Sequence, residues 1–291
     1  MQDSRYYLVF DPLTLFGGVY TGTHRSVQRI VDEVGVLKEL GVNAVYLEND
    51  KQQQGDLKII FRALEQIVKS FPDYKVGLNL LPNKSGKEIL TSYALASYFR
   101  LPFIINDMIV GTHNRDGKTL ETNYILLFKQ RDAHPEIILL GGMNPPYAPL
   151  EFPVNEPVNL SLARKITDAM TVKVTPKEYK EGKELSEERI RLYAGGYANS
   201  GIDTSVINKE FVEGLTKGFC IDQFAGTKPA IVIPASGINA QNIERIARYE
   251  NVGGLIIGSA LRNKETGLLY PPFIIELVEK LARVRDERYS K

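Results

Sequence analysis

The chain has few of the residues on which disulfides and zinc sites depend. Cys220 is the only cysteine among 291 residues, so no intramolecular disulfide can form and no zinc site with two or four cysteines can be built. We interpret Cys220 as a small buried residue rather than as a nucleophile. The three histidines have no HxH or HExxH spacing, which also argues against a zinc site.

Targeting signals and an excess of one charge are also missing. The N-terminus, MQDSRYYLVFDPL, has neither the basic start nor the long apolar stretch of a signal peptide. The longest apolar runs have the length of a strand and fall far short of the roughly 18 residues of a membrane span. With 36 basic and 35 acidic residues, the chain lacks the basic surplus of a general nucleic-acid binder. We expect a cytoplasmic protein without membrane insertion and without a nucleic-acid partner.

What the sequence does contain is an alternation of strand-like and helix-like segments. Short aliphatic runs are followed by stretches whose apolar residues recur at three and four positions, the period of one helix face. The eight expected strands are 6–10, 43–48, 75–81, 102–107, 136–142, 169–175, 230–236 and 254–260. Strands that alternate with helices are parallel and joined by right-handed crossovers, so the pattern predicts an α/β fold, a single (β/α)8 TIM barrel over residues 1–291.

Two points of this fold stay open at the level of the sequence. The sixth strand is either AMTVKVT (169–175) or RLYAGGY (191–197). The whole fold could instead be an open, doubly wound sheet, although the first turn, DPLTLFGGVYTGTH, lacks the GxGxxG pattern typical of that fold. A proline-rich stretch (141–157) and a charged insert (177–192) follow strand ends, and we expect both at the mouth of the barrel.

The last two expected strands end in small residues, in PASGIN and IIGSAL. In TIM barrels the loops after the seventh and eighth strands commonly bind a phosphate through backbone amides, and a side chain there would hold the phosphate away. We therefore predict a phosphate site. Its residues are Ala235, Ser236, Gly237, Gly258 and Ser259. The alternative is that Gly237 and Gly258 only form tight turns.

Several motifs resemble the BtpA family, which is named for a photosystem I biogenesis protein and belongs to the phosphate-binding barrel superfamily. The second, third and fourth units of that family resemble ELGVNAVYLEND, KVGLNLLPN and FIINDMIVGTHNRDG. Its C-terminal end resembles IPASGINAQNI and GLIIGSALRN. The resemblance implies a TIM barrel with a phosphate pocket, but no particular reaction. The name of the family implies an alternative role as an assembly or stability factor.

Polar residues at the ends of the expected strands are the candidates for chemistry, because strand ends line the mouth of a TIM barrel. Glu48 emerges from the apolar run AVYL, and a half-buried carboxylate of this kind can act as a general acid or base. Its alternative role is a salt bridge to a neighbouring loop. The candidate catalytic residues are Glu48, Asp11, Asp107 and Lys173. The other expected pocket residues are Asn49, Asn79, Asn106, His113 and Asn144.

No cofactor is evident, since the chain has no Walker A motif and no flavin or nicotinamide fingerprint. Asp11, Glu48 and Asp107 could together hold Mg²⁺, although nothing in their spacing requires it. The sequence favours an enzyme that acts on a small phosphorylated metabolite, a sugar phosphate or a nucleotide, by isomerase, lyase or glycosyl-bond chemistry. The alternatives are a non-catalytic assembly factor and a metabolite sensor. The apolar face of PPFIIELVEKLARV either covers the barrel or supports a homodimer.

Overall fold

Eight parallel strands close into a barrel in the order β1-β10-β9-β8-β7-β4-β3-β2. The structure is a computed structural model that describes residues 5–22, 26–49, 57–80, 87–106, 108–109, 112–115, 118–142, 166–173, 231–235, 237–249, 252–263 and 265–290. The strands are β1 (Thr14–Tyr20), β2 (Ala44–Glu48), β3 (Lys75–Asn79), β4 (Phe103–Asn106), β7 (Ile138–Gly141), β8 (Ala169–Lys173), β9 (Val232–Ala235) and β10 (Gly254–Ile257). Because β1 pairs with both β2 and β10, the predicted barrel is confirmed and the open sheet is excluded.

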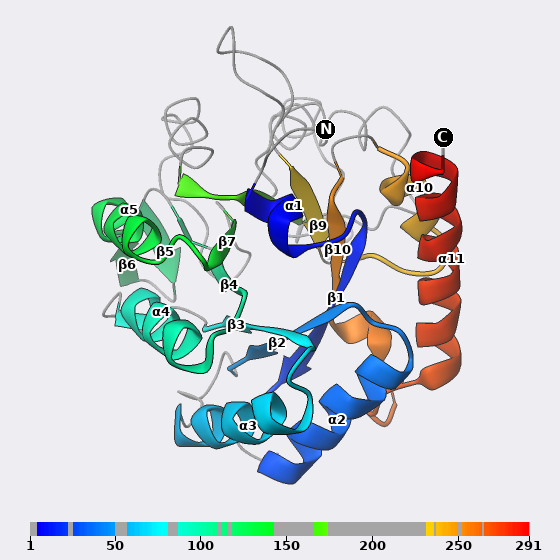
Figure 1. Cartoon of the computed structure of the whole chain (residues 1–291), viewed down its shortest axis with the longest axis horizontal. Coiled ribbons are helices and arrows are strands. Elements are labelled where there is room, and N and C mark those ends of the chain that lie inside the picture. Colours follow the sequence, from blue (N-terminus) through cyan, green and yellow to red (C-terminus); the bar gives the residue numbers. More distant parts are fainter. Residues whose placement is uncertain are drawn as a thin grey trace, which may run out of the picture.

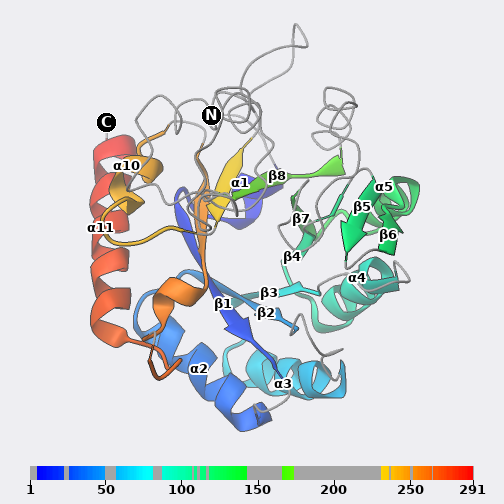
Figure 2. The same cartoon turned by 180° about the vertical axis from the view of Figure 1, so that it is seen from behind.

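Helices surround the barrel on its outside (Figures 1 and 2). They are α2 (Val27–Glu39), α3 (Leu57–Ser70), α4 (Lys87–Phe99), α5 (Tyr124–Ala133), α10 (Ile243–Ala247), the 3-10 helix η2 (Ser259–Leu261) and α11 (Pro271–Tyr289). Local sequence sets their bounds: the Ser26 side chain accepts a hydrogen bond from the Arg29 amide at the start of α2, and Gly41 follows that helix with φ +85°. Ile30, Val34 and Leu37 form its buried stripe.

The apolar core has two layers. The larger layer lies between the strands and the helices and contains residues such as Leu47, Ile60 and Leu277. The smaller layer fills the inside of the barrel and is rich in aromatic side chains. Phe16 of β1 and Phe103 of β4 meet there with ring centroids 5.3 Å apart. Gly77 makes room for Phe103, since a side chain on Gly77 would overlap with that ring.

The first segment differs from the prediction. Residues 6–10 were expected as a strand, but Arg5–Val9 form a helix, α1, and the first strand is β1 at Thr14–Tyr20. Tyr and Val favour strands in general, but here tertiary packing decides. Tyr6 and Phe10 belong to the cluster inside the barrel, and the Tyr6 hydroxyl donates to the Gly253 carbonyl at 3.0 Å, just before β10 begins. Helix α1 therefore closes the N-terminal end of the barrel.

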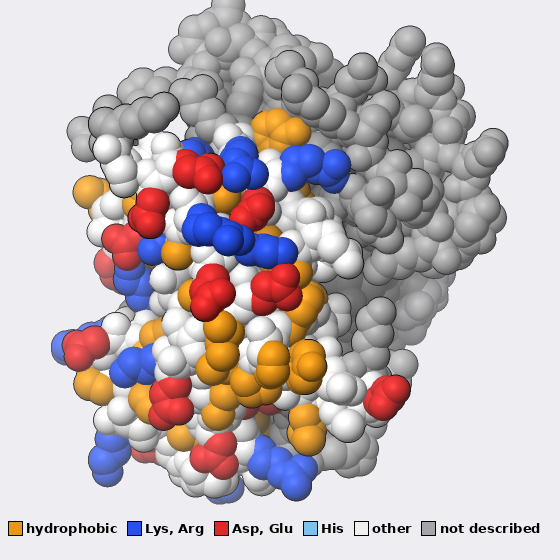
Figure 3. Space-filling model, turned by 90° about the vertical axis from the view of Figure 1, so that its right-hand side faces the viewer, with side chains coloured by type: hydrophobic (Ala, Val, Ile, Leu, Met, Phe, Trp, Pro, Cys, Tyr) orange, Lys and Arg blue, Asp and Glu red, His pale blue; other side chains and the backbone are white. Residues whose placement is uncertain are grey.

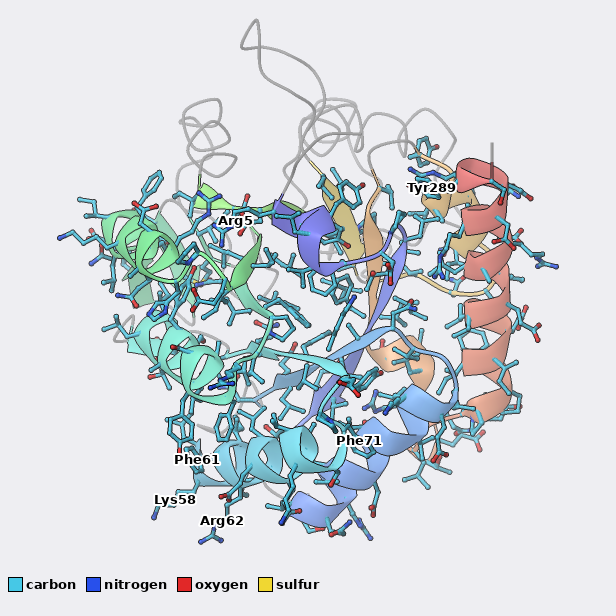
Figure 4. All side chains as sticks on the ribbon, in the orientation of Figure 1. Arg5, Lys58, Phe61, Arg62, Phe71 and Tyr289 are labelled. Atoms are coloured by element: carbon cyan, nitrogen blue, oxygen red, sulfur yellow. The ribbon has the colours of Figure 1, made fainter. Side chains whose placement is uncertain are left out.

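Ion pairs hold α1 in this place. Arg5 donates to the carbonyl oxygen of Ile137 at 2.9 Å, immediately before β7, and Figure 4 shows Arg5 on the side of α1 towards that strand. Its guanidinium lies 3.5 Å from the Asp168 carboxylate, which is 2% exposed. Arg131 of α5 pairs with the same carboxylate at 2.9 Å. The N-terminal end of the barrel is thus tied together by buried charge as well as by aromatic packing.

A second difference lies between β4 and α5. From its sequence alone, TLETNYILLFKQR (119–131) is expected to form one helix. Instead, Thr112–Arg115 and Lys118–Glu121 pair as an antiparallel hairpin, β5 and β6. Helix α5 starts only at Tyr124, where the Asn123 side chain accepts a hydrogen bond from the Leu126 amide. The sequence carries Asp-Gly between the two strands, the commonest signal for a two-residue hairpin loop, and the prediction did not use it.

The choice of the sixth barrel strand is confirmed. β8 is Ala169–Lys173 and pairs with β7 on one side and β9 on the other. The competing segment 191–197 lies outside the described residues, as do the charged insert at 177–192 and all but the first two residues of the proline-rich stretch at 141–157.

Helices α10 and α11 form one face of the molecule (Figure 3). Arg283 pairs with Glu244 at 2.8 Å, and Arg248 pairs with Glu287 at 3.1 Å, so charges of both signs join the two helices. Figure 3 shows charged side chains of both signs and hydrophobic side chains on this face. Of the helices in the described part of the chain, none is long and apolar enough to cross a membrane.

Candidate functional site

Because the eight strands are parallel, their carboxyl ends lie at one rim of the barrel. The last residues of the strands are Tyr20, Glu48, Asn79, Asn106, Gly141, Lys173, Ala235 and Ile257. Five neighbouring strands, in the order β9, β10, β1, β2 and β3, carry most of the predicted site residues. The structure therefore brings the predicted phosphate loops and the predicted acid or base to adjacent parts of the same rim.

Glu48 and Asn79 form a direct contact at this rim. They lie opposite each other in the register of β2 and β3, and the Asn79 amide nitrogen, Nδ2, donates to the Glu48 carboxylate at 2.9 Å. Asn79 is 4% exposed and Glu48 is half-buried. The Glu48 carbonyl accepts from the amide and hydroxyl of Thr21 at 2.8 and 3.1 Å, which fixes the end of β2 against β1. A carboxylate held in one orientation by a buried amide is suited to directed proton transfer.

Two tyrosines that the sequence reasoning missed lie next to this pair. Tyr46 is 4% exposed and, two residues before Glu48, shares its face of β2. The Tyr46 hydroxyl would lie 2.7 Å from a side chain added at Gly18 of β1. Tyr20 ends β1, and its hydroxyl lies where a side chain on Gly258 would be. The alternation in AVYLE was the available signal for Tyr46, whereas Tyr20 was missed because β1 was assigned to the wrong segment.

The loop after β9 is held by asparagine side chains. Gly237 has φ +75°, a conformation that glycine adopts without strain. Its carbonyl accepts from Asn242 Nδ2 at 2.9 Å, and Asn242 Oδ1 accepts from the Asn239 amide at 2.9 Å. Asn242 is 2% exposed. A buried side chain therefore fixes the turn in which the predicted phosphate residues lie, and the sequence analysis did not single it out.

The loop after β10 is held by an arginine. Arg262 donates to the carbonyls of Gly258 at 3.1 Å and Gly18 at 3.0 Å, and it forms an ion pair with Glu33 of α2. Its guanidinium also lies over the Tyr20 ring, 4.9 Å from the centroid. Gly258 is half-buried and Ser259 is exposed. Arg262 thus ties the end of β10 to β1 and α2 and leaves Ser259 at the surface.

The position predicted for Asp11 is wrong. Asp11 was expected after the first strand, at the mouth, but it lies between α1 and β1 and so at the opposite, N-terminal end of the barrel. Its side chain is 77% exposed and lies 3.9 Å from the Lys75 ammonium, at the first residue of β3. Asp11 and Glu48 therefore cannot act together, and the suggested Mg²⁺ site of Asp11, Glu48 and Asp107 is not assembled.

The remaining predicted residues are distributed as follows. Ala235 is buried inside the barrel, and Asn49 is half-buried directly after β2. The Asn106 side chain accepts from the Met108 amide at 2.9 Å and so fixes the turn after β4. Lys173 ends β8, opposite Ala235 in the register, and His113 lies in β5 of the hairpin. Asp107, Asn144 and Ser236 lie outside the described residues. Among the residues that are described, no three His, Cys, Asp or Glu side chains come together as a metal site.

No protein-family model matches the chain, and no curated protein matches it in sequence. Solved structures do match in fold. The tryptophan synthase alpha chain of Legionella pneumophila subsp. pneumophila is similar over 100% of both chains, with a TM-score of 0.54 and 11% identity. Tryptophan synthase from M. tuberculosis matches over 94% of this chain and 92% of its own, with a TM-score of 0.56 and 13% identity.

A phosphoribosyl anthranilate isomerase from Thermococcus kodakaraensis is also similar. The match covers 92% of this chain and 99% of the isomerase, with a TM-score of 0.50 and 10% identity. At such low identities these similarities establish the fold alone. The chain therefore has the TIM-barrel fold of enzymes that include a phosphoribosyl isomerase.

Proposed function

We propose that the protein is an enzyme that acts on a small phosphorylated metabolite at the carboxyl-end rim of the barrel, with Glu48 as the general acid or base. The observation that carries this proposal is the hydrogen bond from Asn79 Nδ2 to Glu48, which fixes a half-buried carboxylate at a strand end. Isomerase and lyase reactions both need a group of this kind to move a proton at a carbon atom.

The phosphate would bind at the loops after β9 and β10. These loops are neighbours because β9 and β10 pair at Ala235 and Ile256. Both contain small residues, and both are fixed from behind by buried polar side chains, Asn242 and Arg262. From β10 to β2 there are two strand spacings, roughly 10 Å along the barrel wall. A small phosphorylated molecule could therefore reach from these loops to Glu48. The phosphoribosyl isomerase of the same fold, by its name, acts on a substrate of this class.

The phosphate site can be tested with inorganic phosphate and isothermal titration calorimetry. Gly237 is a poor choice for substitution, because its φ of +75° would strain any other residue. Ser259→Glu places a negative charge at an exposed position of the β10 loop and should abolish phosphate binding. Ser70→Glu, at the exposed end of α3 and at the other end of the barrel, introduces the same charge as a matched control and should bind like wild type. Equal binding by both variants would refute the site.

The role of Glu48 can be tested separately by proton exchange. Wild-type protein in D₂O should incorporate deuterium at a carbon of a bound sugar phosphate, measured by NMR. Glu48→Gln should bind phosphate normally but exchange more slowly by about 10²- to 10⁴-fold, the usual range for a lost general acid or base. Exchange that is unchanged in Glu48→Gln would remove Glu48 from the chemistry.

The resemblance to the BtpA family rests on the sequence motifs, and it stays a prediction. The family name favours an assembly factor or, with a retained pocket, a sensor of phosphorylated metabolites. Phosphate binding without any carbon exchange, in wild type and Glu48→Gln alike, would support that alternative over an enzyme.

A further inference from the structure

Only one of the two polar atoms of the Asn79 side chain has a hydrogen-bond partner among the described residues. Its nitrogen donates to Glu48 at 2.9 Å, but its oxygen, Oδ1, is buried and accepts no hydrogen bond from the part of the chain that the structure describes. The orientation of the amide follows from Glu48: a carboxylate accepts hydrogen bonds, so the NH₂ group must face it and the oxygen must face elsewhere.

A buried carbonyl oxygen without a donor is unfavourable, and most such oxygens in proteins are satisfied by the chain itself or by water. Asn79 lies on the inner face of β3, because Gly77, two residues earlier, faces the ring of Phe103 inside the barrel. Its position at the last residue of β3 places it at the rim beside Glu48.

We infer that Asn79 Oδ1 accepts a hydrogen bond from a hydroxyl group of the substrate, and that the substrate is therefore a sugar phosphate or phosphorylated polyol. This inference rests on the proposed function, because it assumes that the phosphate lies at the β9 and β10 loops. The geometry then assigns two ends to the substrate: a phosphate at the glycine loops, and a hydroxyl-bearing carbon beside the hydrogen-bonded pair of Asn79 and Glu48. Asn79 is therefore a specificity residue: it favours substrates that carry a hydroxyl group at this position, and it does not contact the phosphate.

The test compares inorganic phosphate with three phosphorylated polyols: glycerol 3-phosphate, ribose 5-phosphate and glucose 6-phosphate. Wild type should bind at least one of the three about ten-fold more tightly than inorganic phosphate. Asn79→Ala should lose most of this advantage and bind inorganic phosphate as wild type does. Asn79→Leu, which keeps the volume of the side chain, should behave in the same way if the alanine variant folds poorly.

Asn43→Ala is the matched control. The Asn43 side chain accepts from the Leu15 amide at 2.9 Å next to the start of β2, at the other end of the barrel. This variant should lose stability and keep the preference for the polyol phosphates. The inference is overturned if inorganic phosphate binds but no polyol phosphate binds more tightly, or if the asparagine variants keep the preference. If neither phosphate nor the three esters bind to wild type, the proposed function itself fails.

Discussion

The contacts of Arg262 with Glu33, Gly18 and Gly258, here called the Arg262 brace, allow a quantitative prediction of stability. Its side chain is 8% exposed and that of its partner Glu33 is 13% exposed, so the ion pair is largely shielded from water. Arg262 also donates to two backbone carbonyls, at 3.0 and 3.1 Å. The substitution Arg262→Met removes the charge and all these donors while it keeps much of the apolar stem.

The expected cost follows from the burial of the pair. Removal of one partner of a buried ion pair leaves an uncompensated charge and costs about 3–5 kcal/mol. We expect Arg262→Met to lower the free energy of unfolding by about 4 kcal/mol, because the two carbonyls also lose a donor. Glu33→Gln keeps an acceptor and should cost somewhat less, about 3 kcal/mol. The double variant should be more stable than the sum of the two losses predicts, by roughly 2 kcal/mol, because both substitutions remove the same ion pair.

Urea unfolding at 25 °C gives the free energy of unfolding of wild type, the two single variants and the double variant. Arg248→Met is the matched control, since Arg248 and Glu287 pair at 3.1 Å but are 49% and 54% exposed. An exposed pair contributes about 0–1 kcal/mol, so this variant should unfold almost like wild type. If Arg262→Met costs no more than Arg248→Met, or if the double variant is strictly additive, the brace does not stabilise the β10 loop and the reasoning is refuted.

The remaining predictions concern tyrosine hydroxyl groups. The Tyr93 hydroxyl is buried without a partner among the described residues, so Tyr93→Phe should raise the free energy of unfolding by about 1 kcal/mol at pH 7, whereas Tyr6→Phe, which loses a 3.0 Å bond to a backbone carbonyl, should lower it by about 1 kcal/mol. Burial is the main cause that raises the pKa of Tyr93 above its ordinary value. The folded state therefore favours the neutral hydroxyl, and wild type loses stability as the pH rises above the ordinary tyrosine pKa of about 10. Phenylalanine does not ionise, so urea midpoints above pH 10 should fall less in Tyr93→Phe than in wild type. Gly258→Ala would place a methyl group on the position of the Tyr20 hydroxyl and should lower the free energy of unfolding by about 1–3 kcal/mol. Adding Tyr20→Phe should restore most of that loss, because the next ring atom is 3.2 Å from the methyl position. A double variant no more stable than Gly258→Ala would contradict this.

The alternation of strands and helices was predictable because each unit carries its own local signals. In AVYLE, KVGLN and GLII the apolar runs end at the observed strand ends or close to them. The first unit failed because local preference and tertiary packing disagree there. The strand TLFGGVY contains two glycines and resembles a loop, yet at Gly18 a side chain would meet the Tyr46 hydroxyl at 2.7 Å, so the glycine is required inside the barrel.

The candidate site was predictable only where it lies at strand ends. Glu48 and Asn79 were both selected by position, but their hydrogen bond depends on the register of β2 and β3, which a single sequence does not specify. Arg262 gave no sequence signal, because its partners lie in β1, in the loop after β10 and in α2. Contacts between residues separated by 229 positions, such as Arg262 and Glu33, arise only when the barrel closes.

The position of Asp11 at the N-terminal end of the barrel bears on which reaction class we propose for the site. Hydrolysis of a glycosidic bond ordinarily uses two carboxyl groups on either side of the bond, and Asp11 was the candidate partner of Glu48. With Asp11 at the other end of the barrel, Glu48 is the one carboxylate among the last residues of the eight barrel strands. Among the described residues of the rim, a single carboxylate beside a buried amide favours our proposal of proton transfer at a carbon atom over glycosyl transfer. Deuterium exchange should therefore be observed at a carbon that bears or adjoins a hydroxyl group, without release of a free base or sugar. Release of such a product by wild type, and its loss in Glu48→Gln, would instead indicate a second acid in the part of the rim that is not described.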